Sequence, residues 1–230
     1  GHEGHTIRDE YAIQQFVKRG YTVWSLDMPL IGENSAPVTI LHPVLGEILI
    51  SNHDQFAFLD EVTTGSPIRY FLEPVEALVN MAEAQGYQEI FIVGLSGGGW
   101  TTTLAAAIDP RIDASYPVAG SVPLGLRFDH DKNWGDWEQV IPELYQIASY
   151  EDLYIMGAHH RSQIQVLNEY DLCCFDEPRY VLYQDDIQAV LGLIGGHFEV
   201  YWDDGEFVHW ISPSALDVIL QDLQDRRSDP

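Results

Sequence analysis

The spacing of apolar residues along the chain alternates between two patterns, one typical of helices and one typical of strands. In several segments, apolar positions recur three and four residues apart, as on one face of an amphipathic helix. These segments are residues 6–19, 67–85, 136–147, 150–156, 185–193 and 213–223. Gly20 and Gly86 follow the first two and should end them, whereas Pro74 should kink the second or mark its start.

Short runs of β-branched, aromatic and aliphatic residues lie between the predicted helices and predict strands. The runs are residues 21–26, 90–93, 114–118, 163–167 and 197–202. Residues 38–51, which include Pro43 and Gly46, predict a small hairpin or an irregular excursion. Strands that alternate with helices in this way predict an α/β fold, a mostly parallel sheet with helices on both faces.

Composition limits the number of domains and the classes of molecule that the chain can bind. With 230 residues, of which 46% are hydrophobic and 12% aromatic, the chain can bury one sizeable core, so residues 1–230 read as a single domain. The protein is acidic, with a formal charge of −25 that repels phosphates and anionic lipids. We therefore expect neither a nucleic acid nor a membrane as partner.

The candidate chemistry begins at residues 94–99, GLSGGG, which follow a predicted strand and precede a predicted helix. Gly94-x-Ser96-x-Gly98 in this context is the nucleophile-elbow pattern, in which a serine takes a strained backbone conformation between small neighbours. The stretch does not fit either of the common glycine-rich phosphate-binding patterns. The pattern therefore predicts Ser96 as a nucleophile.

The strand, elbow and helix resemble the α/β-hydrolase superfamily, and the resemblance covers nearly the whole chain. Residues 1–5, GHEGH, look like the HG-type oxyanion loop that follows the third strand of that fold. Residues 109–112 (DPRI) and 150–153 (YEDL) are similar to acetyl-ester and dienelactone-hydrolase-like branches. The resemblance implies that the N-terminal strands are missing, so that the strands at 21–26 and 90–93 would face an empty slot.

A nucleophilic serine needs a histidine to take its proton and a carboxylate to orient that histidine. In the superfamily the acid follows the serine on a loop after a later strand, and the histidine comes last. Asp171 lies beyond the strand at 163–167, and Glu169 and Asp176 are the nearby alternatives. We therefore predict Asp171 as the acid.

Only two histidines, His197 and His209, follow this acid in the chain. His197 opens the last strand, at the sheet edge away from Ser96 if the strand is parallel. His209 follows that strand, on the same edge as Ser96. The prediction is therefore a triad of Ser96, Asp171 and His209.

The oxyanion of the transition state needs two preorganised donors. The first is the amide of Gly97, after the nucleophile, and the resemblance implies the amide of His2 as the second. No cofactor and no metal site are predicted, because the adjacent His159 and His160 would rarely chelate one ion together. His2, His5, His42 and His53 are scattered, without the spacing of a metal-binding helix.

The two cysteines, Cys173 and Cys174, are adjacent. An adjacent pair would close only a strained ring and no other partner exists, so we expect no disulfide framework but a pair of buried, inert thiols.

The leading hypothesis is a serine hydrolase that cleaves small carboxylic esters through an acyl-enzyme. Two alternatives remain open, a serine peptidase of the same fold and a non-catalytic binding module. The binding module would keep the fold and an apolar pocket lined by Trp100, Trp134 and Trp137.

Overall fold

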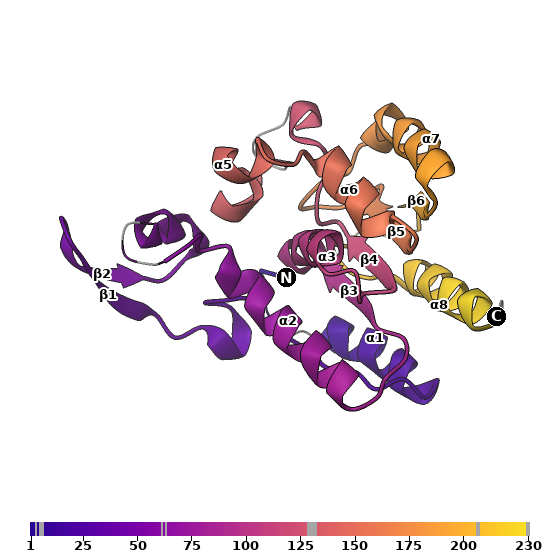
Figure 1. Cartoon of the computed structure of the whole chain (residues 1–230), viewed down its shortest axis with the longest axis horizontal. Coiled ribbons are helices and arrows are strands. Elements are labelled where there is room, and N and C mark those ends of the chain that lie inside the picture. Colours follow the sequence, from indigo (N-terminus) through magenta and orange to yellow (C-terminus); the bar gives the residue numbers. More distant parts are fainter. Residues whose placement is uncertain are drawn as a thin grey trace.

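The computed structural model describes residues 1–2, 4, 7–60, 62, 64–127, 133–205 and 208–228. At its centre lies a parallel sheet of four strands in the order β3-β4-β5-β6 (Figure 1). The strands are β3 (Phe91–Leu95), β4 (Ala114–Val118), β5 (Ser162–Asn168) and β6 (His197–Asp203). Because all four run in the same direction, the loops that leave their carboxyl ends lie along one edge of the sheet.

Helices cover both faces of this sheet, as predicted (Figure 1). One face packs against α3 (Gly97–Ile108), α6 (Tyr150–Ala158) and α7 (Gln184–Ile194). The other face packs against α1 (Ile7–Lys18) and α8 (Pro213–Ser228). Alternate residues of β4 point into the core between the sheet and α1 and α8, since successive side chains of a strand point to opposite faces. No helix among the described residues has the length and apolar composition to cross a bilayer.

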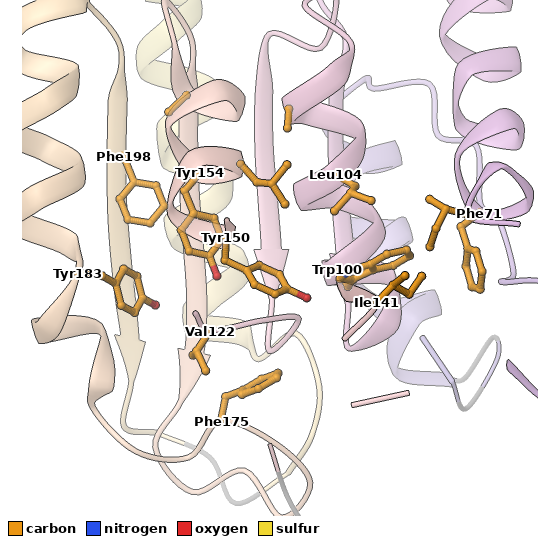
Figure 2. Packing of buried hydrophobic residues seen from close by; sticks show 14 of the residues in the cluster. Phe71, Trp100, Leu104, Val122, Ile141, Tyr150, Tyr154, Phe175, Tyr183 and Phe198 are labelled. Atoms are coloured by element: carbon orange, nitrogen blue, oxygen red, sulfur yellow. The ribbon is translucent and has the colours of Figure 1, made fainter. Parts of the chain in front are cut away.

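The core between the sheet and α3, α6 and α7 is rich in aromatic rings (Figure 2). Trp100, Tyr150 and Tyr154 are buried completely or almost so, and the ring of Tyr154 stacks on Phe198 at 5.4 Å between centroids. Gln165 of β5 is buried in the same layer, where its amide donates to the Ser121 carbonyl at 2.6 Å. Hydrogen bonding therefore offsets the cost of burying the Gln165 amide.

Two further strands and two further α-helices in the described part of the chain lie outside the four-stranded sheet and the helices that cover it. Strands β1 (Val38–His42) and β2 (Gly46–Ile50) form the predicted hairpin, which projects away from the sheet beyond α2 (Figure 1). Helix α2 (Arg69–Ala84) packs on α3, and α5 (Pro142–Tyr145) is a single turn. Pro74 does not mark the start of α2, because the helix already begins at Arg69.

The prediction of a strand at residues 21–26 is wrong. These residues pair with no strand in the described part of the chain, and β3 is an edge strand there. Residues 22–29 and β3 instead line a pocket of about 310 Å³, together with parts of α1 and α2. A strand exists only through a ladder of backbone hydrogen bonds to a neighbour, and no such ladder joins the two segments. An N-terminally incomplete domain stays a prediction.

The helix predicted at 136–147 is broken into a 3-10 turn, Trp137–Gln139, and α5. Ile141 between them has φ −62° and ψ 114°, outside the helical region. Pro142 is the cause, because a proline ring disfavours the helical conformation of the residue before it.

Candidate active site

Ser96 forms the sharp turn between β3 and α3. Its backbone has φ 58° and ψ −125°, a conformation that non-glycine residues rarely adopt. The turn is held from both sides, because the Ser96 amide donates to the Val118 carbonyl at 2.8 Å and its carbonyl accepts from the Trp100 amide at 3.0 Å. A Cβ at Gly94 would overlap the Gly98 carbonyl, which explains why position 94 is a glycine. The strained elbow is therefore present as predicted.

Asp171 and His209 form a hydrogen-bonded pair on the loops that follow β5 and β6. His209 Nδ1 lies 2.7 Å from Asp171 Oδ2, and the carboxylate is fully buried. The amides of Cys173 and Cys174 donate to Asp171 Oδ1 at 2.8 and 3.1 Å, and Asn168 Nδ2 lies 3.3 Å from Oδ2. Because a carboxylate accepts, Nδ1 of His209 carries the proton in this pair and Nε2 is left for other chemistry.

The charge on Asp171 is stabilised by these partners. Burial by itself raises the pKa of a carboxyl group, but the hydrogen bond and charge of His209 and the two cysteine amides outweigh it and lower the pKa of Asp171 below its ordinary value. Asp171 is therefore ionised throughout the neutral range.

The structure does not join the serine to this pair directly. No hydrogen bond links Ser96 to His209 in the described part of the chain, and His209 Nε2 is buried without a hydrogen-bond partner. Contacts between a catalytic base and its nucleophile are often long in the absence of substrate.

The alternative acid and base have other surroundings. Glu169 Oε2 accepts a hydrogen bond from Trp202 Nε1 at 3.3 Å. His197 is the first residue of β6, at the sheet edge opposite the elbow, and its half-exposed side chain lies 3.6 Å from Glu199. Neither has the buried carboxylate–histidine contact that Asp171 and His209 make.

The first residues of the chain lie against the elbow. A Cβ at Gly1 would be 3.0 Å from the Cβ of Ser96, and a Cβ at Gly97 would be 2.5 Å from His2 Cε1. This is the location that the resemblance implies for the oxyanion loop, while the role of the His2 amide stays a prediction. His5, in the same stretch, lies outside the described residues.

A second titratable group, which sequence reasoning missed, includes His2, His53, Asp136 and Glu138. Burial opposes a charge on His2, but its hydrogen bonds to Asp136 and Glu138 raise its pKa to about 9. Burial likewise opposes the charge of Glu138, and contacts with the two histidines lower its pKa below the ordinary value. No spacing rule could have found this group, because its members lie up to 136 residues apart.

The expectation of inert, buried thiols is wrong. Cys173 and Cys174 form a disulfide with each other, and Cys173 is exposed. The loop turns tightly here, with both cysteine amides directed at Asp171 and with Phe175 at φ 59°. The backbone turn, and not the sequence separation, decides whether adjacent sulfurs meet.

No protein-family model and no curated protein match the sequence. Among solved structures, a cold-adapted esterase from an Arctic intertidal metagenomic library aligns with 99% of this chain and 79% of its own, at 16% identity and a TM-score of 0.57. TT1662 from Thermus thermophilus aligns over 98% and 85%, at 16% identity and a TM-score of 0.58. The chain spans 62% of the length of SOBER1 from Arabidopsis thaliana, at 18% identity and a TM-score of 0.43. The first two likenesses show a shared fold.

Proposed function

We propose that this chain, which has the α/β-hydrolase fold, is a serine hydrolase that cleaves carboxylic esters through an acyl-enzyme intermediate. The observation that carries the proposal is the buried hydrogen bond between Asp171 and His209, on the sheet edge that also carries the strained Ser96. Packing alone does not require a serine, a histidine and a carboxylate at the ends of three different strands.

In this mechanism Ser96 Oγ attacks the ester carbonyl while His209 Nε2 takes the hydroxyl proton. His209 then gives the proton to the departing alkoxide, and Asp171 stabilises the imidazolium that forms in between. The amides of Gly97 and His2 hold the oxyanion. A water molecule, activated by the same histidine, then attacks the acyl-serine and releases the acid.

We expect small and medium neutral or cationic esters as substrates, with no cofactor. An alkoxide leaves more easily than an amine, so an ester needs less help from the enzyme than a peptide. The charge of −25 disfavours anionic substrates, most strongly at low ionic strength. Hydrolysis rates of p-nitrophenyl acetate, butyrate and decanoate, compared with a peptide anilide, check this. Faster anilide cleavage would favour the peptidase.

Covalent labelling with a fluorophosphonate probe tests the nucleophile. We expect one label per chain in the wild type and in Ser35→Ala, an exposed serine, and none in Ser96→Ala. Ser96→Ala should also lower kcat by roughly 10⁴-fold to 10⁶-fold without unfolding the protein. Retained turnover in Ser96→Ala would contradict the proposal. An unlabelled wild type that hydrolyses no ester would favour the binding module, although the complete burial of Trp100 in the core argues against a tryptophan-lined pocket.

A further inference from the structure

Four side chains of metal-ligating types, from three separate segments, meet beside the elbow. The donor atoms of His2, His53, Asp136 and Glu138 all lie within 4.8 Å of one another. His53 opens the 3-10 helix His53–Leu59, Glu138 lies in the turn Trp137–Gln139, and Asp136 directly precedes that turn. We propose that these four residues bind one divalent ion of the zinc class.

His2 Nε2 faces more acceptor atoms than it has hydrogens to donate. His2 Nε2 lies 2.9 Å from Asp136 Oδ2, 3.2 Å from Glu138 Oε1 and 3.0 Å from His53 Nδ1. An imidazole nitrogen carries at most one hydrogen, which cannot serve three acceptors well. A cation among these atoms would satisfy all four at once.

The orientation of His53 supports the same conclusion. Its Nε2 lies 2.7 Å from the carbonyl oxygen of Pro29, to which it can only donate. In the neutral ring, Nδ1 then carries the lone pair, and Nδ1 is the nitrogen that faces the cluster. A backbone carbonyl that holds the far nitrogen is the usual way in which a protein orients a metal-binding histidine.

The distances between donor atoms identify the class of ion. The five distances that involve His2 or His53 run from 2.9 Å, between His2 and Asp136, to 3.6 Å, between His53 and Asp136. Zinc–nitrogen bonds of about 2.0–2.1 Å place tetrahedral ligands roughly 3.3 Å apart, inside this range. Two imidazoles with two carboxylates suit zinc, whereas magnesium and calcium prefer oxygen ligands alone.

Burial and charge give an independent reason to expect a cation. Glu138 is fully buried and its Oε2 has no hydrogen-bond partner among the described residues, while the side chain of His53 is only 2% exposed. One protonated imidazole balances only one of the two carboxylates in this cluster, whereas a divalent ion would balance both. Asp136 is 47% exposed and His2 is partly exposed, so an ion can enter from solvent on their side.

Hydrogen bonds around the four side chains hold the site in place even when no ion is bound. The hydroxyl of Tyr145 accepts from Trp100 Nε1 at 2.7 Å and lies 3.1 Å from the Glu138 carbonyl oxygen, to which it donates. The Trp137 amide donates to Asp54 Oδ1 at 3.3 Å, which ties the turn carrying Glu138 to the helix carrying His53. A rigid second layer of this kind preorganises a metal site.

The test is metal binding, which does not depend on catalysis. The chain, stripped with a chelator, is titrated with Zn²⁺ by calorimetry and with Co²⁺ by visible absorption. We expect one ion per chain and the intense absorption of tetrahedral Co²⁺. His53→Gln and Glu138→Gln should weaken binding by more than about 100-fold, since losing even a supporting residue costs 10-fold to 100-fold. His197→Gln, an exposed histidine on β6, should bind as the wild type does.

Asp136→Asn and His2→Gln provide a second pair of variants, at the more exposed ligands, in case the buried variants do not fold; circular dichroism checks folding. Cys173, Cys174 and His209 form a second group of metal-ligating residue types. The double variant Cys173→Ser/Cys174→Ser should bind Zn²⁺ normally, which would show that the ion does not bind at that second group. No stoichiometric binding, a weak octahedral Co²⁺ spectrum, or binding that survives all four ligand variants would overturn the proposal.

Discussion

Two histidine–carboxylate groups in this protein use the same residue types and differ in geometry. In one, His209 makes a single short contact with Asp171 through Nδ1, and its Nε2 has no hydrogen-bond partner in the part of the chain that the structure describes. In the other, His2 presents one nitrogen to three acceptors, among them His53 Nδ1 and Glu138 Oε1. The two groups therefore differ in the number of acceptor atoms that face the histidine nitrogen.

That difference carries a chemical lesson. A histidine with one fixed acceptor and one open nitrogen can take up and release a proton, because its tautomer is set. A histidine nitrogen among several lone pairs is poorly served by a proton and well served by a cation. The first group therefore suits proton transfer and the second suits metal binding.

The largest effect should come from breaking the first group. Asp171→Asn removes the charge that fixes the tautomer of His209, and we expect kcat/KM for p-nitrophenyl acetate to fall by about 10⁴-fold. Glu169→Gln should stay close to the wild type, because Glu169 contacts Trp202 instead. The opposite ranking would assign the acid to Glu169.

The next effect concerns the scaffold of the second group. Tyr145→Phe leaves Trp100 Nε1 without its acceptor in the core, which should cost about 1–3 kcal/mol in the free energy of unfolding. Urea denaturation measures this loss, and Zn²⁺ affinity should fall with it. Tyr11→Phe, at an exposed position, is the control and should change stability by less than about 0.5 kcal/mol. Equal unfolding midpoints for the two variants would show that Tyr145 does not support the site.

A smaller effect should follow from opening the disulfide beside Asp171. In Cys173→Ser/Cys174→Ser the two amides can still donate to Asp171, but from a less constrained loop. A weakening of about 1 kcal/mol, the net value of one hydrogen bond, would lower kcat roughly fivefold. The wild type treated with a dithiol reductant should show the same loss. Unchanged kcat in both cases would mean that the loop holds Asp171 without the disulfide.

The smallest effect is a pH dependence of stability, which a comparison of the wild type with Asp171→Asn isolates for the first group. Because the pKa of Asp171 is lowered on folding, its ionised form stabilises the protein above the unfolded value of about 3.9. This contribution is lost as the pH falls through the lower folded pKa. The difference in the free energy of unfolding between the wild type and Asp171→Asn should therefore shrink as the pH falls below about 4. A constant difference from pH 7 to pH 2 would contradict this account.

The sequence alone determined those features that depend on neighbours in the chain. The elbow is readable because a strained serine requires small residues on both sides, and Gly94 and Gly98 are there. Asp171 and His209 could be selected because parallel strands bring their carboxyl ends to one edge, so chain order predicts proximity. The break at Ile141 also follows from a local rule and could have been predicted from Pro142.

Only the tertiary structure decided the rest. Residues 21–26 have the composition of a strand, but a strand depends on a partner that composition does not specify. Cys173 and Cys174 meet because the loop turns around Asp171. His53 and Glu138 meet because the turn that carries Glu138 packs against the helix that begins at His53. Contacts between residues this far apart in the chain arise from the packing of whole elements, which no local pattern of residues encodes.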